Sequence, residues 1–185
     1  MQRELKAIQQ RLGTTFVHVT HDQEEAMAIA DTVVVMQAGR VADAGPPDRV
    51  YLRPANAFTA GFMGEINLLP ARIEATGPDG TVLDTPLGRC QVLEPPPAGP
   101  QLRIGVRPEQ LKLAVGRSDE EATMVFEAAV IESVFAGPHQ RARLQIADGT
   151  EIVAQLPQSF AAAPEARVSL QLKTSDLILL SDSEA

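Results

Sequence analysis

The sequence predicts an α/β segment followed by an all-β segment, with the change near residue 65. Residues 2–64 alternate between helix-like and strand-like patterns, an order that is typical of α/β domains. From Asn67 onward, short runs of alternating apolar and polar residues are separated by turns rich in Gly and Pro, as in β-barrels and β-sandwiches. The chain has 185 residues, of which 44% are apolar, enough for two small domains, 1–65 and 66–185.

The first predicted element is a helix over residues 2–12. Leu5, Ile8 and Leu12 recur at helical spacing and lie on one face, and Gly13 is a suitable C-terminal stop. No Ser, Thr, Asp or Asn precedes this helix to cap its first turn. Two interpretations stay open: Met1 is the initiator and the helix end frays, or the sequence is a truncated piece of a longer one, which we favour.

Residues 14–20, TTFVHVT, are rich in β-branched and aromatic residues and predict a strand. A short helix follows, because Asp22 can cap its N-terminus and Glu25, three residues later, completes a pattern like a capping box. The apolar side of this helix consists of Ala26, Met27, Ile29 and Ala30.

The continuous apolar run TVVVM, 32–36, predicts a strand that is covered on both faces. We then expect a tight turn at 37–40, a returning strand at 41–45 and two short helices within 46–53 and 54–64. The order strand, helix, strand predicts a βαβ unit at the end of an α/β domain. Two core strands cannot bury a sheet with two apolar faces. We therefore expect the first 65 residues to expose apolar surface when they are alone.

The second half contains ten runs with strand character. They are LPARIEAT, TVLDT, GRCQVL, QLRIGV, LKLAV, MVFEAAVIESVF, QRARLQIA, EIVAQLP, RVSLQLK and DLILL. Within IADGTEIV, the Asp-Gly pair predicts a hairpin with a type I′ turn. The polar stretch 116–123 connects two β halves, and the final residues 181–185 are expected to be disordered.

Composition excludes several classes of function. The net charge of −8 argues against binding to nucleic acid and against a polybasic contact with membranes. A single cysteine, Cys90, excludes an intrachain disulfide and fits a reducing compartment. No apolar run approaches the ~20 residues that span a bilayer, and the N-terminus has no signal core. We expect a soluble, cytoplasmic protein whose link to a membrane runs through partners, with no direct insertion and no metal site.

His21 is the candidate functional residue of the first segment. It follows the predicted strand 14–20 and precedes a helix, and ligands of open α/β sheets bind beyond the carboxyl ends of strands. An imidazole there can exchange hydrogen bonds with a bound group. The alternative is a surface-loop histidine without a role. His18 lies within the predicted strand and is expected to pack in the core.

Residues 14–64 resemble the C-terminal part of the ATP-binding subunit of bacterial ABC importers. The motifs that carry the resemblance are VTHDQEEAM, AD, VVVMQAGRV, GPPDRVYLRPAN and FMGEIN, in the family's order and spacing. The resemblance implies that His21 is the switch-loop histidine, a catalytic residue that contacts the γ-phosphate of ATP and helps hold the attacking water. ATP and Mg²⁺ are the cofactors that it implies for the complete subunit.

Other parts of an ATP site are absent from this sequence. It contains no Gly-Lys pair of a phosphate-binding loop (Walker A), no LSGGQ-like signature and no strand that ends in the Asp-Glu pair of a Walker B motif. Asp31 is expected to be a structural residue at a helix end. In the family these parts lie upstream, so we expect the fragment alone to need no cofactor and to be inactive as an ATPase.

Residues 66–185 resemble the regulatory domain that follows the ATPase in these importers, a TOBE domain with an oligonucleotide-binding-like (OB-like) β-barrel. The specific matches are Arg107-Pro108-Glu109 and the sequence GEIN at 64–67. Pro108 should fix a turn, while Arg107 and Glu109 could pair with each other or cap it. The basic cluster HQRARL, 139–144, is expected to be a solvated strand face.

The resemblance therefore implies part of a subunit that couples ATP hydrolysis to solute uptake, with polyamines or ferric iron as the suspected solute. It implies permease subunits, a second copy in a homodimer and, indirectly, a periplasmic solute-binding protein as partners, at the cytoplasmic face of the inner membrane. The alternative is a stand-alone, non-enzymatic module that senses a ligand through its TOBE domain.

Overall fold

The computed structural model describes residues 2–97, 99, 101–114 and 122–181. The chain divides into two compact units, Met1–Gly64 and Glu65–Ala185, each of which is described by itself. Most of the expected connector, 116–121, and most of the expected disordered end, 182–185, lie outside the described residues. No helix in the described part of the chain is long and apolar enough to cross a membrane.

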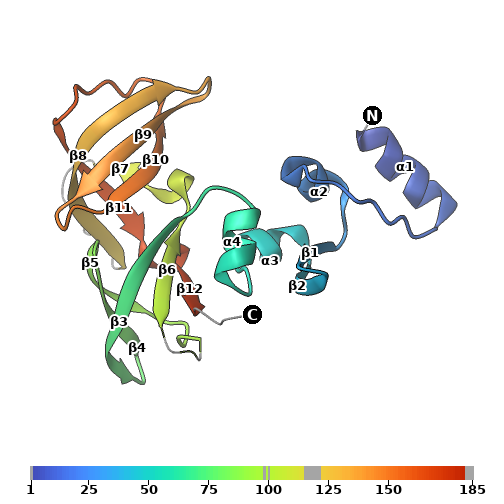
Figure 1. Cartoon of the computed structure of the whole chain (residues 1–185), viewed down its shortest axis with the longest axis horizontal. Helices are drawn as coiled ribbons and strands as arrows, with labels where there is room; N and C mark the ends of the chain where they lie inside the picture. Colours follow the sequence, from blue (N-terminus) through green and yellow to red (C-terminus); the bar gives the residue numbers. More distant parts are fainter. Residues whose placement is uncertain (1, 98, 100, 115–121, 182–185) are drawn as a thin grey trace. The chain divides into compact units, whose positions relative to one another are not determined.

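The first unit contains four helices and one hairpin among its described residues (Figure 1). In chain order they are α1 Gln2–Leu12, α2 Gln23–Ile29, β1 Val33–Gln37, β2 Arg40–Gly45, α3 Pro47–Leu52 and α4 Ala57–Phe62. All six were predicted. Local signals explain the ends of the short helices: Pro47 occupies the first turn of α3, and the Asn56 side chain accepts a hydrogen bond from the Thr59 N–H to cap α4.

The hairpin of β1 and β2 is closed by Ala38 and Gly39, both at positive φ (49° and 79°). This pair of positive φ values defines a type I′ turn, which suits the twist of two antiparallel strands. Val33 and Val35 are buried, with Val50 and Met63 as the other members of a small core. Val34 and Met36 are 52% and 58% exposed, so the expectation that β1 is covered on both faces is wrong. A two-stranded sheet has too few neighbours to cover its second face.

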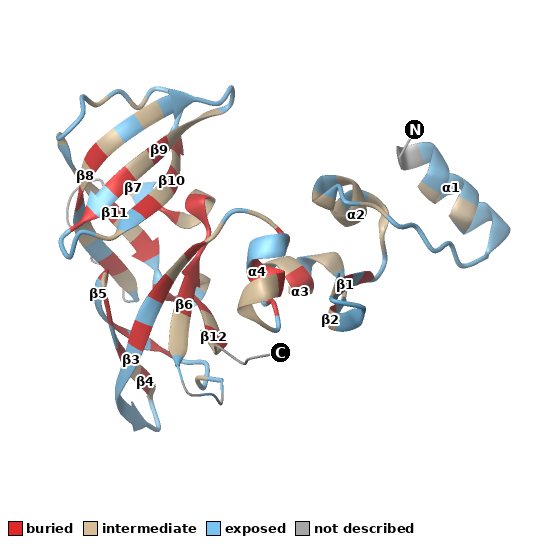
Figure 2. Cartoon of the chain, viewed as in Figure 1, coloured by how far each residue is buried: buried red, intermediate tan, exposed pale blue. Residues whose placement is uncertain are grey.

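The predicted strand at 14–20 does not form, and with it the predicted βαβ unit is wrong. No described strand pairs with these residues, and Val17 and Val19 are 88% and 91% exposed. β-Branched residues favour a strand only where a partner supplies the hydrogen-bond ladder. Figure 2 shows the segment between α1 and α2, in which residues 14–19 are exposed and Thr20 is half-buried. Exposed apolar side chains such as Phe16, Val17 and Val19 agree with the expectation that the first unit exposes apolar surface, although it also has the small core described above.

The second unit is built from ten strands and two 3₁₀ helices within its described residues. They are β3 Asn67–Gly77, β4 Gly80–Thr85, β5 Gly88–Val92, β6 Leu102–Val106, η1 Pro108–Gln110, β7 Lys112–Leu113, β8 Thr123–Phe135, β9 His139–Ile146, β10 Glu151–Pro157, β11 Arg167–Lys173, η2 Thr174–Asp176 and β12 Ile178–Ser181. All ten predicted strand runs are confirmed. The strands form two antiparallel five-stranded sheets, in the orders β10-β9-β8-β11-β7 and β12-β6-β3-β4-β5 (Figure 1).

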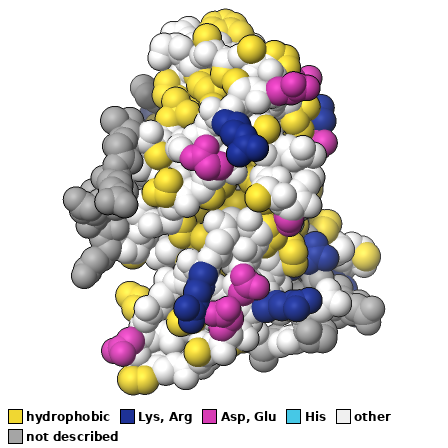
Figure 3. Space-filling view, turned by 90° about the vertical axis from the view of Figure 1, so that its left-hand side faces the viewer, with side chains coloured by type: hydrophobic (Ala, Val, Ile, Leu, Met, Phe, Trp, Pro, Cys, Tyr) yellow, Lys and Arg dark blue, Asp and Glu magenta, His cyan; other side chains and the backbone are white. Residues whose placement is uncertain are grey.

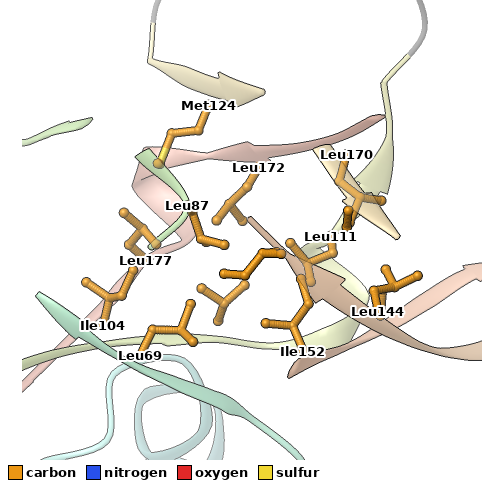
Figure 4. Close-up of a cluster of buried hydrophobic side chains, with 14 of the residues drawn as sticks. Leu69, Leu87, Ile104, Leu111, Met124, Leu144, Ile152, Leu170, Leu172 and Leu177 are labelled. Carbon is orange, nitrogen blue, oxygen red and sulfur yellow. The ribbon is translucent and has the colours of Figure 1, made fainter. Parts of the chain in front are cut away.

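Both sheets line one core. Leu69 and Ile104 come from the second sheet, and Leu144 and Ile152 come from the first, and all four are nearly inaccessible to solvent. Their side chains converge in Figure 4. In the first sheet, the edge strands β10 and β7 contact each other, so this sheet curls toward a barrel. The segment η1 lies beside β10 at this junction.

The hairpin predicted from IADGTEIV forms between β9 and β10, but its turn differs from the expected type I′. Asp148 has negative φ, Gly149 has a φ of 89°, and the Gly149 N–H donates to the Ile146 carbonyl at 2.9 Å. This geometry is that of a three-residue loop in which a type I turn is followed by a left-handed glycine. The Asp148 carboxylate accepts the Thr150 N–H at 2.9 Å, which stabilises this alternative.

Candidate functional site

His21 occupies a bend between the extended segment 14–20 and helix α2. Its side chain is exposed and lines a shallow, open depression together with Asp22, Gln23 and Glu24. Within the described part of the chain, the imidazole makes no hydrogen bond. Since 14–20 is not a strand, the expectation that His21 follows a strand end is wrong. The ring is nevertheless open to approach by a ligand, and its role stays a prediction.

The backbone on both sides of His21 is held by hydrogen bonds. Asp22 caps α2 as predicted, because its carboxylate accepts the Glu25 N–H at 3.0 Å. The reciprocal half of the predicted capping box runs through Thr20. The Asp22 N–H donates to the Thr20 hydroxyl at 3.0 Å, and that hydroxyl donates to the Glu25 carboxylate at 3.0 Å. Thr20 therefore bridges the two groups that a capping box would join directly.

His18 is exposed, so the expectation that it packs in the core is wrong. Its side chain is 45% exposed, and its Nε2 lies 3.3 Å from Glu25 Oε2. The cause is the missing strand, because without a sheet there is no buried face for His18 to enter. Three side chains, those of His18, Thr20 and Asp22, thus converge on Glu25. The sequence signalled only the contact with Asp22.

An ion pair between a buried aspartate and a partly exposed arginine stabilises the C-terminal part of the first unit. The Asp43 side chain is nearly inaccessible, and it accepts hydrogen bonds from Arg49 Nη2 at 2.6 Å and from the Ala55 N–H at 2.8 Å. Burial by itself raises the pKa of the Asp43 carboxyl, but the hydrogen bond and charge of Arg49 and the backbone N–H groups together lower the pKa below its usual value. The sequence analysis did not single out either residue.

In the second unit, Arg107, Pro108 and Glu109 form the corner that the sequence predicted. Arg107 is extended (φ −70°, ψ 140°), as the residue before a proline prefers, and Pro108 begins η1. The Gln110 N–H donates to the Arg107 carbonyl at 3.0 Å and closes the turn. Arg107 makes no side-chain cap of this turn. The residue is 1% exposed, and its Nη1 donates to the Glu65 carbonyl at 3.2 Å.

The residues Glu65, Ile66 and Asn67 join several strands of the second unit. The carboxylate of Glu65 receives two hydrogen bonds from Arg141 on β9. Ile66 packs over Gly105, where an added Cβ would lie 2.7 Å from Ile66 Cδ1. The Asn67 side chain bonds to the backbone of Val106 on β6 and of Val153 on β10. The sequence analysis noted the GEIN motif, but no local signal shows which strands it contacts.

The basic cluster at 139–144 is a partly solvated strand face, as predicted, and its arginines are ion-paired. Arg143 Nη1 lies 2.8 Å from Glu132 and Nη2 lies 2.9 Å from Glu151, each on a neighbouring strand. Hydrogen bonds to Glu65 raise the pKa of Arg141, and those to Glu151 and Glu132 raise the pKa of Arg143. Figure 3 shows basic and acidic side chains side by side on a face of this unit. Since these charges are compensated, the cluster offers little net attraction for anions.

Within the described residues, no group of three or more His, Cys, Asp or Glu side chains could hold a metal ion. Cys90 is a free, buried thiol, and burial raises its pKa to about 11. A thiol with such a pKa is protonated at neutral pH and is a weak nucleophile.

Within the second unit, residues 104–180 match the family model of the TOBE domain. The second unit carries a TOBE domain. The match begins in β6 and includes Arg107, Pro108 and Glu109. It ends in β12, so it spans parts of both sheets of the unit.

This TOBE region is homologous to that of importer ATP-binding subunits. The chain is 37% identical over 158 residues to the spermidine/putrescine import ATP-binding protein PotA of Marinobacter nauticus, with 83% of this chain and 41% of the relative covered. It is 34% identical over 182 residues to the Fe(3+) ions import ATP-binding protein FbpC 1 of Rhizobium meliloti, with 96% of this chain and 49% of the relative covered. The chain therefore spans about half the length of these relatives.

A solved structure resembles the fold of the TOBE-containing unit. The cytoplasmic molybdate-binding protein ModG matches with a TM-score of 0.52 at 16% identity, and the match covers 62% of this chain and 95% of ModG. At this identity the likeness concerns the fold alone.

Proposed function

We propose that this chain is the C-terminal part of the ATP-hydrolysing subunit of an ABC importer, and that His21 acts on the γ-phosphate of ATP. The observation that carries the proposal is the homology to import ATP-binding proteins, which in one relative extends over 96% of this chain. The exposed imidazole of His21, beside an open depression, is compatible with this role. In this proposal the first unit is the end of a nucleotide-binding domain.

The chemistry assigned to His21 is positioning and charge stabilisation. Phosphoryl transfer depends mainly on how the reacting groups are held and how the developing charge is stabilised. An imidazole N–H can donate to a phosphate oxygen, and the same ring can orient a water molecule. The chain has no Gly-Lys pair, and its described residues contain no cluster of three or more His, Cys, Asp or Glu side chains that could hold a metal ion. ATP and Mg²⁺ would be held mainly by other parts of the complete subunit, and this chain alone would not hydrolyse ATP.

The proposed partners follow from the same homology. They are the permease subunits, a second copy of the complete subunit and, indirectly, a periplasmic solute-binding protein, which would place the protein at the cytoplasmic face of the inner membrane. The names of the relatives support a polyamine or ferric iron as the solute. The solute itself would contact other subunits. The choice between a polyamine and ferric iron therefore has to come from transport measurements.

A fusion tests the proposal directly. The N-terminal part of the Marinobacter nauticus relative, which this chain does not match, is joined to the full chain, and ATP hydrolysis is measured with the fusion and with the chain alone. We expect hydrolysis by the fusion only, and loss of turnover in the fusion with His21→Ala. His139→Ala, a histidine substitution in the second unit, serves as the control and should retain turnover.

Three outcomes would count against the proposal. A folded, ATP-binding fusion whose turnover survives His21→Ala would remove the assigned role of His21. ATP turnover by the chain alone would contradict the proposed division of the ATP site. A fusion that folds and binds ATP but shows no turnover at all would favour the alternative of a stand-alone, ligand-sensing module.

A further inference from the structure

The two residues that flank His21 are both hydrogen-bonded to Glu25, Thr20 to its carboxylate and Asp22 to its backbone N–H. The Thr20 hydroxyl donates to Glu25 Oε2 at 3.0 Å, and it accepts the Asp22 N–H at 3.0 Å. On the other side of His21, the Asp22 carboxylate accepts the Glu25 N–H at 3.0 Å. These contacts form a closed ring that runs from Thr20 to Asp22 to Glu25 and back, with His21 as the residue enclosed between the first two.

The ring is the main attachment of this part of the chain to helix α2. Residues 15–19 form no strand ladder, and most of their side chains point into solvent. Apart from the 3.3 Å approach of His18 to Glu25, the described residues show no other hydrogen bond or ion pair from 15–19 to the helix. Without the ring, fewer hydrogen bonds would therefore hold the backbone at His21 against the start of α2.

We infer that Thr20 and Glu25 are positioning residues for His21. This inference rests on the function proposed above, since it assigns to the ring the task of holding the His21 backbone in the orientation that phosphoryl transfer requires. The Thr20 hydroxyl uses both its donor and its acceptor, so it fixes the bend on two sides. The Glu25 carboxylate makes the bond to Thr20 charge-assisted, which strengthens it relative to a neutral contact.

The chemistry of the ring distinguishes conservative from disruptive substitutions. Thr20→Ser keeps the hydroxyl, whereas Thr20→Val keeps the shape and removes both hydrogen bonds. Glu25→Gln keeps an acceptor for Thr20, whereas Glu25→Ala removes it. Thr76, an exposed threonine on β3, supplies the matched control Thr76→Val.

The first measurement uses the full chain and does not depend on ATP. Amide hydrogen exchange of Asp22 and Glu25 is followed by NMR in each variant. In Thr20→Val we expect the Asp22 amide to exchange about fivefold to tenfold faster, as the loss of a typical hydrogen bond predicts, with recovery in Thr20→Ser. Exchange of the Val35 amide in β1 reports whether the unit remains folded. Unchanged exchange at Asp22 in folded Thr20→Val would overturn the inference.

The second measurement uses the fusion described above. We expect Thr20→Val and Glu25→Ala to lower kcat on the order of tenfold to a hundredfold, as small misplacements of catalytic groups do, with little change in KM for ATP. Thr20→Ser and Glu25→Gln should recover most of the loss, and Thr76→Val should match the unsubstituted fusion. A merely structural role would lower the amount of folded protein and would leave kcat per folded molecule unchanged.

The outcomes separate this inference from the proposed function. If His21→Ala abolishes turnover while Thr20→Val and Glu25→Ala turn over normally, the inference is wrong and the proposed function stands. If His21→Ala itself has no effect in an active fusion, the proposed function fails, and the ring loses its assigned purpose whatever the exchange data show.

Discussion

The side-chain amide of Asn67 pairs with the backbone of Val153 as a neighbouring strand would. The Val153 N–H donates to Asn67 Oδ1 at 2.7 Å, and Asn67 Nδ2 donates to the Val153 carbonyl at 2.8 Å. Val153 lies on β10, the edge of one sheet, whereas Asn67 begins β3 in the other. One side chain therefore satisfies edge groups that would otherwise lack a strand partner, and it connects the two sheets.

We predict that Asn67→Ala destabilises the second unit by about 1–3 kcal/mol, because the partly buried N–H and carbonyl of Val153 at the β10 edge lose their partner. Urea unfolding followed by circular dichroism measures the change. Gln91→Ala is the control, since the Gln91 amide also bonds to a backbone carbonyl but is exposed. Equal stability of the two variants would show that the Asn67 hydrogen bonds stabilise the unit no more than the exposed hydrogen bond of Gln91 does.

Arg107→Ala should destabilise the same unit by about 2–3 kcal/mol, because it removes a charged hydrogen bond to the Glu65 carbonyl and leaves a space in a buried site. Arg107→Lys should recover little, since an ammonium group cannot reproduce the planar set of guanidinium donors. Arg72→Ala, which removes an exposed arginine on β3, should change the stability by less than about 0.5 kcal/mol. Thermal unfolding of the three variants provides the comparison.

Cys90 should resist thiol reagents while the chain is folded. Its side chain is buried, and its pKa is raised to about 11, so only about one thiol in a thousand is ionised at pH 8. We expect slow modification by a disulfide reagent at pH 8 and complete modification once urea unfolds the chain. Stoichiometric labelling of the folded chain on mixing would refute the assigned burial.

The first unit should lose stability in acid through Asp43. The folded-state pKa of this carboxyl lies below its ordinary value of 3.8. The stabilisation is therefore fully present above the unfolded pKa, near pH 4, and it is lost as the pH falls through the folded pKa. Tyr51 packs against the small core of the first unit, so its fluorescence can report unfolding. The titration runs from pH 6 to pH 2, about 4 pH units that include the ordinary pKa of an aspartate.

Asp43→Asn supplies the control for this pH dependence. The variant keeps an acceptor for the Ala55 N–H but loses the charge that attracts Arg49. It should be less stable than the original chain at pH 6 and should show a flatter dependence on pH in the acid range. An identical acid transition in both proteins would mean that other carboxyl groups control it.

Much of the candidate site could be predicted from local signals. Asp22 is followed three residues later by Glu25, and the predicted cap forms between them. Thr20 could not be predicted as the bridge, because its role depends on the path of residues 14–19, which the pattern assigned to a strand. His18 was misplaced for the same reason: a β-rich run forms a strand only if another strand is available.

By itself, the sequence determined where the chain turns, which short helices form and in what order the ten strands of the TOBE-containing unit follow one another along the chain. These features depend on residues close together in the chain, such as the pairs Ala38-Gly39 and Asn56-Thr59. Only the tertiary structure decided that residues 14–19 stay exposed and that Arg107 is buried, with a hydrogen bond to the Glu65 carbonyl. It also decided that the Asn67 side chain bonds to Val153, which lies 86 positions further along the chain. Such contacts depend on which distant strands become neighbours, and no local pattern encodes that choice.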